Sequence, residues 1–180
     1  MNMSILGLQR GTVRLEEYNP EWSNLFEQEK ELLLKTFGNK IIAIAHIGST
    51  AISGLQAKPI IDINVAVRSL DDITDFITKL QELGYEYIPE RRFSDRQFFP
   101  KGPSEKRTHH LNLVEITSET GWENHILFRD YLREHEDIRN EYAKLKKELA
   151  EKYADNRDEY TERKSKFVVG IINKAKGDKL

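Results

Sequence analysis

Apolar residues divide the chain into a front part with both strand-like and helical spacing and a back part with helical spacing alone. Residues 41–45 are apolar throughout, which predicts a strand buried on both faces. Residues 60–67 also predict an apolar strand, but Asp62 and Asn64 interrupt it on one face. A carboxylate on such a strand is costly to bury unless a cation or a metal ion compensates its charge. We therefore expect the molecule to be organised around these two strands and the segment between them.

Further periodic segments complete the expected set of elements. Helices are expected over about residues 20–37 (capped by Asn19), 73–83 (with a capping box at 69–72), 122–134, 136–153 and 157–175. Additional strands are expected at Val13–Leu15, 85–88, 91–99 and 109–115, after a loose lead-in over residues 1–12. Strands that alternate with helices before an all-helical end predict an α/β fold (α+β by stricter use), a small mixed sheet flanked by helices.

Length and composition bound the class of protein. The 180 residues are expected to form one domain over 1–180, with an α/β core at about 13–118 and a helical part at about 120–176. The net charge of −2 does not favour a nucleic-acid partner, and the absence of cysteine excludes disulfides and thiol chemistry. No apolar run is long enough for a secretory signal or a bilayer span, so we expect a cytoplasmic protein without a membrane partner. Glu27, Glu29 and Glu31 are expected to form a solvated helix face.

The segment between the two central strands carries the residue types of a phosphate site. Gly48-Ser49 directly follows the first strand, and a Gly-Ser turn lets backbone amides approach phosphate oxygens. Asp62 lies on the next strand, where a carboxylate beside phosphate oxygens suits Mg²⁺. The plainer alternatives are an ordinary tight turn and a structural salt bridge from Asp62 to Lys58 or to an arginine.

The stretch HIGSTAISGLQAKPIIDI, residues 46–63, resembles the signature of the GrpB family, a group of nucleotidyltransferase-like proteins. Further motifs that resemble the family occur in order at Tyr18–Trp22, Gly84-Tyr85, His109–Asn112, Phe128–Arg133, Tyr142–Lys146 and Tyr160–Lys164. The resemblance implies a fold similar to the DNA polymerase beta-type nucleotidyltransferases. Their signature is a Gly-Ser turn followed by an Asp-x-Asp or Asp-x-Glu strand. A related module also occurs fused to dephospho-CoA kinase.

The resemblance also implies an activity and roles for individual residues. The activity would be metal-dependent transfer of a nucleotidyl group from an NTP to a small-molecule acceptor, with Mg²⁺ or Mn²⁺ as cofactor. Catalytic roles are implied for Asp62, His110 and Asn112, and metal-binding roles for Asp62 and Asn64. Phosphate-binding roles are implied for Gly48, Ser49, Thr50, Lys58, Arg129 and Arg133. Asn64 departs from the acidic second metal position of the nucleotidyltransferases, since an amide brings no negative charge.

Basic residues elsewhere are the remaining candidates for binding an anionic substrate. Arg129 and Arg133 are one turn apart on an expected helix, so both could contact one anion. Further basic candidates are Lys58, Arg91, Arg92, Arg107 and Lys164. Tyr160, near Lys164 on the last expected helix, is a candidate to close the site.

Two other functions stay open at this point. A non-catalytic nucleotide- or coenzyme-binding module would keep the phosphate site and lack the second carboxylate, as Asn64 indicates. A hydrolase or isomerase would instead use His46, His109 and His110 with Asp62 to hold a transition metal. For His46 and His109 individually, a structural role is the simpler expectation.

Overall fold

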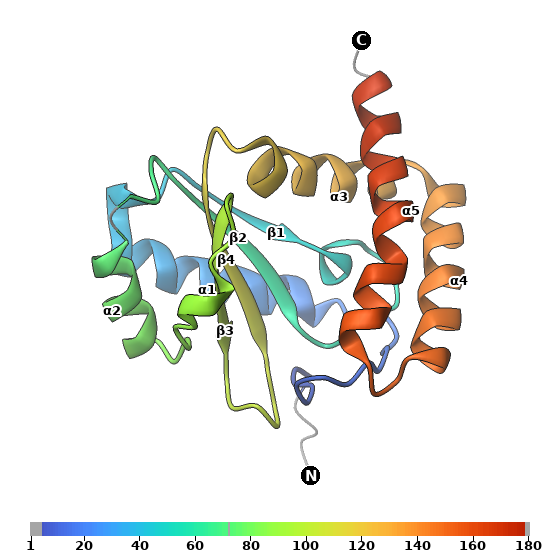
Figure 1. Ribbon diagram of the computed structural model, residues 1–180, viewed down its shortest axis with the longest axis horizontal. Coiled ribbons are helices and arrows are strands. Elements are labelled where there is room, and N and C mark those ends of the chain that lie inside the picture. Colours follow the sequence, from blue (N-terminus) through green and yellow to red (C-terminus); the bar gives the residue numbers. More distant parts are fainter. Residues whose placement is uncertain (1–4, 72, 179–180) are drawn as a thin grey trace.

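The fold is a four-stranded mixed sheet with helices on both of its faces, as seen in a computed structural model that describes residues 5–71 and 73–178 (Figure 1). Within the described residues the strands are β1 (Ala43–Ile47), β2 (Ile61–Val67), β3 (Arg96–Lys101) and β4 (His109–Glu115), in the order β1-β2-β4-β3. The two central strands, β2 and β4, run parallel, and each edge strand pairs antiparallel with its neighbour. The predicted mixed α/β class is confirmed.

The register of β2 on β4 sets the polar face of the sheet. Asp62 is the partner of His110, and Asn64 is the partner of Asn112. Because side chains of paired residues lie on the same side of a sheet, these polar side chains form one cluster. The intervening residues of both strands point to the other side and are buried in an apolar core. The alternation in the sequence therefore places one apolar face and one polar face on each central strand.

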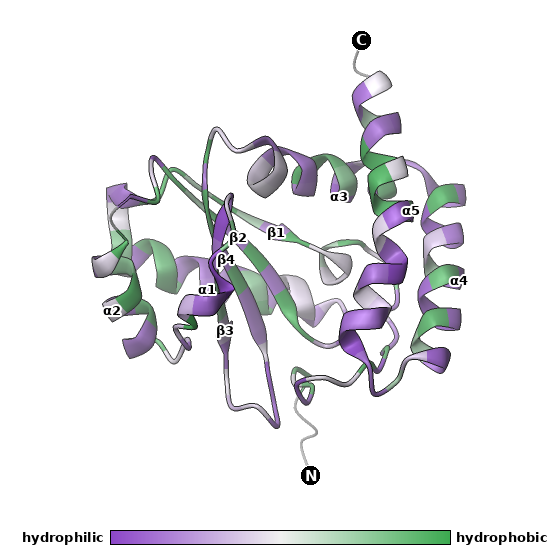
Figure 2. Cartoon of the chain, in the orientation of Figure 1, coloured by the Kyte–Doolittle hydropathy of each residue, from purple (hydrophilic) through white to green (hydrophobic). Residues whose placement is uncertain are grey.

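Helices α1 (Glu21–Phe37) and α2 (Thr74–Glu82) cover the apolar face of the sheet. As expected, Asn19 caps α1, since its side-chain oxygen accepts a hydrogen bond from the Glu21 backbone N–H at 3.0 Å. The other three helices, which Figure 1 draws together and away from α2, are α3 (Asn124–Glu134), α4 (Glu136–Lys152) and α5 (Arg157–Gly177). Hydrophobic and hydrophilic residues alternate along these helices in Figure 2, and their apolar sides enclose a second core around Leu132 and Ile171.

Several expected elements differ from the structure. Val13–Leu15 is not a strand, and the isolated bridge nearby joins Glu16 to Ala57. The expected strand at 85–88 is reduced to one bridge, between Tyr85 and Lys101, and the expected strand at 91–99 begins only at Arg96. Short β-rich stretches form strands only where a partner strand lies alongside, which local sequence does not specify. The capping box expected at 69–72 includes residue 72, which lies outside the described residues.

From residue 5 onward the N-terminal segment is not the loose lead-in expected over residues 1–12, of which residues 1–4 lie outside the described residues. The backbone N–H of Gly7 donates to Pro59 at 2.9 Å, and that of Leu8 donates to Arg107 at 3.0 Å. Val13 N–H donates to the carbonyl of Ala154 at 2.6 Å, beyond the end of α4. The segment therefore joins the sheet to the helical part. Among the described residues, no helix is long and apolar enough to cross a membrane.

Candidate functional site

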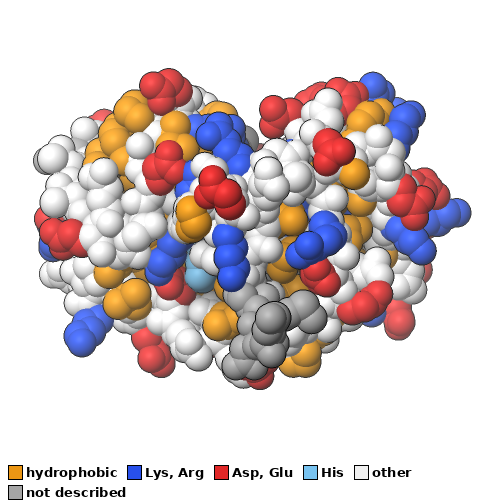
Figure 3. Space-filling view, turned by 90° about the horizontal axis from the view of Figure 1, so that it is seen from below, with side chains coloured by type: hydrophobic (Ala, Val, Ile, Leu, Met, Phe, Trp, Pro, Cys, Tyr) orange, Lys and Arg blue, Asp and Glu red, His pale blue; other side chains and the backbone are white. Residues whose placement is uncertain are grey.

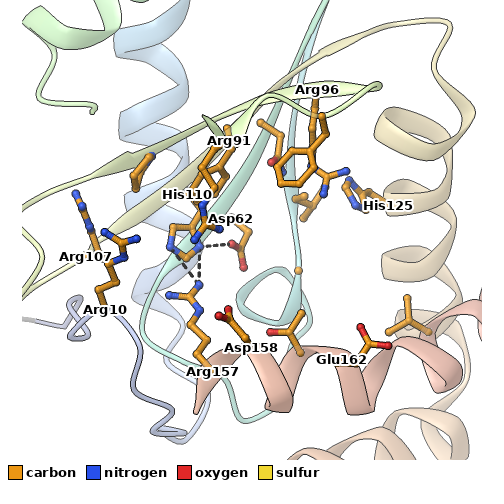
Figure 4. A pocket seen from close by; sticks show the side chains of 18 of the residues that line it. Arg10, Asp62, Arg91, Arg96, Arg107, His110, His125, Arg157, Asp158 and Glu162 are labelled. Carbon is orange, nitrogen blue, oxygen red and sulfur yellow. Dashed lines mark hydrogen bonds and ion pairs between the residues drawn. The ribbon is translucent and has the colours of Figure 1, made fainter. Parts of the chain in front are cut away.

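A cavity of about 680 Å³ lies against the polar face of the sheet. Its walls come from the N-terminal segment (Arg10), β2 (Asp62), β4 (His110), α3 (His125) and α5 (Arg157), as the close-up in Figure 4 shows. Figure 3 views the molecule from below, and Lys and Arg side chains surround the place where a histidine is visible at the surface. The cavity thus brings distant parts of the chain together around Asp62, and its lining also includes Asp155, Asp158 and Glu162.

Gly48 brings the backbone after β1 directly against Asp62. Its φ of +70° is a left-handed conformation that suits glycine. A Cβ at this position would lie only 2.6 Å from Asp62 Oδ2, so a larger residue would displace the carboxylate. The Gly-Ser turn therefore contacts the carboxylate of the next strand, as the sequence motif predicts.

Asp62 and His110 form a hydrogen-bonded pair at the centre of the cavity. His110 Nδ1 lies 3.1 Å from Asp62 Oδ1, and because an ionised carboxylate only accepts, the proton is on Nδ1. Although burial alone would raise the pKa of Asp62, the hydrogen bond from His110 and the charges of Lys58 and Arg157 lower it. Burial lowers the pKa of His110, opposed by Asp62. At neutral pH the site therefore holds a carboxylate beside a neutral imidazole.

Three cationic side chains surround this single carboxylate. Arg157 Nη2 lies 3.3 Å from both ring nitrogens of His110, and Figure 4 shows its guanidinium group beside Asp62 and His110. The ammonium groups of Lys58 and Lys164 lie 5.6 Å and 4.2 Å from the ring centroid of Tyr160. Burial lowers the pKa of Lys58 to about 7 and that of Lys164 to about 8, with Arg157 adding to both shifts. Cationic groups therefore outnumber carboxylates among the groups that shift the pKa values of Asp62, Lys58 and Lys164.

Ser49 lies beneath this cluster and is held by α4. Lys146 Nζ donates to Ser49 Oγ at 3.0 Å and also to the backbone carbonyl of Gln56. Lys146 is buried beside the Tyr142 ring, and burial, followed by the charges of Lys164 and Lys58, lowers its pKa well below the usual value. The Ser49 hydroxyl is therefore oriented by a buried lysine from the helical part.

Asn64 is fully occupied by protein partners rather than directed into the cavity. Its Nδ2 donates to the Gly121 carbonyl at 2.8 Å and lies 3.0 Å from His125 Nδ1. Its Oδ1 accepts a hydrogen bond from Asn112 Nδ2 at 3.1 Å. The residue at the second metal position is thus a buried structural amide.

These donors do not fit a divalent metal site of the nucleotidyltransferase type. Such a site needs carboxylates that together offset the charge of the ions, whereas Asp62 alone faces Lys58, Arg157 and Lys164. Asn64 does not line the cavity, and its oxygen accepts a hydrogen bond from Asn112. In the described part of the chain, no group of three or more His, Asp or Glu side chains is arranged to hold a metal ion.

The histidines of the transition-metal alternative are dispersed. His46 Nε2 is bonded to Thr50 Oγ1 at 2.9 Å, and its ring stacks on Phe26 with a centroid separation of 4.6 Å. His109 Nδ1 forms a hydrogen bond with Thr108 Oγ1 at 2.9 Å. Burial lowers the pKa of both His46 and His109 to about 4, so both are neutral structural groups at pH 7.

Arg129 and Arg133 are not brought to the cavity that contains Asp62. Arg129 Nη1 donates to the His46 carbonyl at 3.0 Å, and Arg133 donates through Nε and Nη2 to the Ala51 carbonyl at 3.0 and 2.7 Å. Both line a separate, smaller hollow beside β1. They connect α3 to the segment around the Gly-Ser turn, and their role in anion binding stays a prediction.

Sequence reasoning missed three residues of the site. Arg157 and His125 carry no motif, because each becomes relevant only once its helix lies over the sheet. Lys146 did carry a signal, since it follows Tyr142 by four residues on the apolar side of α4. A lysine in that position is unusual enough to suggest a buried role.

The protein is therefore a mixed α/β protein with a cavity on the polar face of its sheet. The sequence profile of the GrpB protein family matches residues 12–174. The chain belongs to the GrpB family.

Relatives across bacteria agree with this assignment. The chain is 40% identical to the glutamate-rich protein GrpB of Alkalihalophilus pseudofirmus, with 94% of this chain and 99% of that protein covered. It is 42% identical to the protein YqkA of Bacillus subtilis over 88% of this chain, but it spans only 46% of YqkA. The crystal structure of GrpB from Enterococcus faecalis superposes with a TM-score of 0.83 at 36% identity, covering 90% of this chain and 96% of that one.

Proposed function

We propose that the protein binds a phosphate-bearing nucleotide or coenzyme in the cavity beside Asp62, and that binding does not require a divalent metal. The observation that carries this proposal is the excess of positive charge among the groups that act electrostatically on Asp62. Lys58, Arg157 and Lys164 surround Asp62, and partly buried cations are costly unless anions compensate them. A ligand phosphate would supply the missing negative charge and would accept charge-assisted hydrogen bonds.

The composition of the cavity wall supports a small-molecule ligand. Arg10, Arg91 and Arg107 also line the cavity, which adds cations at a distance from Asp62. The volume of about 680 Å³ lies within the range of cofactor sites. Gly48 lines the cavity and would lie next to the bound phosphate, in keeping with the motif that first indicated a phosphate site, whereas Ser49 is bonded to Lys146 outside the cavity lining.

Metal-dependent nucleotidyl transfer is the second candidate. The observation that favours it is the contact of Gly48 with Asp62, which reproduces the order of parts in the nucleotidyltransferase signature. It would require a divalent ion at Asp62 despite the cations around that carboxylate. The two candidates therefore differ in their dependence on metal.

The deciding experiment is a thermal-shift measurement with ATP, GTP, CoA and dephospho-CoA, each in Mg²⁺ and in EDTA. A ligand at about 100 times its Kd stabilises the folded state by about 2.7 kcal/mol, or roughly 5–10 °C in Tm. We expect this shift in EDTA, and we expect Arg157→Gln to abolish it. Arg163→Gln is the matched control, because Arg163 lies on the same helix, its side chain is 59% exposed and pairs with Glu159, and it does not line the cavity.

Two other outcomes would contradict metal-independent binding. A shift that appears only with Mg²⁺ and disappears in Asp62→Asn would favour nucleotidyl transfer over metal-independent binding. No shift with any of the four ligands, in either condition, would contradict both candidates.

A further inference from the structure

The cavity changes in chemical character along its length. Figure 4 shows Arg10 and Arg107 at one end, Asp62 and Arg157 in the middle, and a different set of groups at the opposite end. A ligand that only carried phosphate would use the first two regions and leave the third empty.

The opposite end presents flat, polarisable groups. Phe93 lines the cavity with 43% of its surface exposed, and the Arg96 guanidinium carbon lies 4.4 Å from its ring centroid. Phe98 also lines the cavity but lies nearer its middle, where its half-buried ring has its centroid 5.2 Å from that of His110. Figure 4 places Arg96 beside His125 at this end. The exposed ring of Phe93 and the arginine stacked on it are groups on which a planar ring can stack.

Along helix α5, which forms the facing wall, the residues that line the cavity also change from cationic to apolar. Arg157 begins the helix at the cationic region, and Val168 lines the cavity eleven residues later, about 16 Å along the axis at 1.5 Å per residue. Asp158 and Glu162 lie between them, and neither carboxylate forms an ion pair with a described residue. In Figure 4 Glu162 lies along α5 from Asp158, away from Arg157.

We propose that the Phe93 end of the cavity binds the aromatic base of a nucleoside phosphate, with Asp158 and Glu162 accepting hydrogen bonds from sugar hydroxyls. This inference rests on the proposed function, because the phosphates of the ligand occupy the region of Arg157. Carboxylates suit sugar hydroxyls, which donate, and repel phosphates, so their position between the two ends fits the middle of a nucleotide. A ligand with an aliphatic tail would use Phe93 and Val168 but would gain nothing from Arg96, His125 or the two carboxylates.

The test compares ATP with inorganic triphosphate by isothermal titration calorimetry in EDTA. The wild type is expected to bind ATP at least about tenfold more tightly than triphosphate, from stacking of the base. Phe93→Ala should remove most of that preference and leave triphosphate affinity unchanged. Leu34→Ala is the control, since Leu34 is 42% exposed on α1 and lies outside the cavity lining. Glu162→Gln should weaken ATP more than 2′,3′-dideoxy-ATP.

The outcomes separate this inference from the function on which it rests. Equal affinity for ATP and triphosphate in the wild type, or an unchanged preference in Phe93→Ala, would overturn the base site and keep the phosphate site. Absence of binding by both probes would overturn the phosphate site and the base site together.

Discussion

At the scale of single residues, the site depends on how closely the backbone approaches one carboxylate. Gly48 holds a left-handed conformation and leaves room for Asp62 Oδ2. Gly54, only six residues later, also has a positive φ of +77°, but a Cβ there would meet open space. Substituting Gly48 and Gly54 in turn therefore separates the energetic cost of a side chain at positive φ from the cost of a side chain that contacts Asp62.

Gly48→Ala is expected to destabilise the protein by more than Gly54→Ala and to weaken nucleotide binding at least tenfold. Both substitutions carry a conformational cost of about 1–2 kcal/mol, but only the first moves the Asp62 carboxylate. Chemical denaturation and calorimetric titration with ATP would measure the two effects. Equal behaviour of the two variants in binding would mean that the position of Asp62 does not matter for the ligand.

At the scale of elements, a buried polar group connects α1 to the sheet. Glu29 was expected on a solvated helix face, but it is only 7% exposed. It accepts hydrogen bonds from Tyr85 Oη at 2.8 Å and from Lys101 Nζ at 2.7 and 2.9 Å. The expectation was wrong for Glu29 because the helix period identifies an apolar stripe but not a polar residue at its border whose partner lies on a distant strand.

Glu29→Ala should therefore lower the free energy of unfolding by about 2–4 kcal/mol, since it leaves Tyr85 and Lys101 without their acceptor. Glu27→Ala is the matched control on the same helix. Glu27 pairs with Lys30 at the surface, and its loss should change stability by about 0.5 kcal/mol or less. Denaturant titration of both variants would decide, and similar costs would show that the Glu29 contacts are not stabilising.

Periodicity predicted the helices and the strands β2 and β4, because apolar spacing is local information. The expectation of a strand buried on both faces at 41–45 was wrong, since β1 is an edge strand and Ile42 is 49% exposed. The Gly-Ser motif and Asp62 were also found, since their contact is encoded within one short stretch. The pairing of Asp62 with His110 was not, because nothing local specifies that β2 and β4 are parallel neighbours. Likewise, Arg157 joins the site only through the packing of α5, which depends on the whole core.

At the scale of the whole molecule, the charged groups of the site come from separate parts of the fold. Lys58 precedes β2, Lys164 and Arg157 lie on α5, and Asp62 is the charge of opposite sign among the groups that shift both lysines. The pKa values of Lys58 and Lys164 are lowered to about 7 and about 8. An anion bound beside them favours their charged forms and hence raises these pKa values.

Anion binding should consequently be accompanied by proton uptake above pH 7. Because the free protein loses these protons as the pH rises through about 7 and 8, ATP affinity is expected to fall at least about threefold from pH 7.5 to pH 9. Titration calorimetry in two buffers of different ionisation enthalpy would measure the uptake. Lys164→Arg keeps the charge without titrating in this range, so it should reduce the fall. Affinity independent of pH would exclude the lysines from the ligand's surroundings.

The N-terminal segment has a consequence for the way the protein is made. Its backbone is hydrogen-bonded to Arg107, just before β4, and to Ala154, just beyond α4. Arg10 forms part of the cavity wall. During synthesis this segment is made well before both of its partners. The cavity can therefore be completed only after α5 has been made, so Arg10 reaches its final position long after its own synthesis.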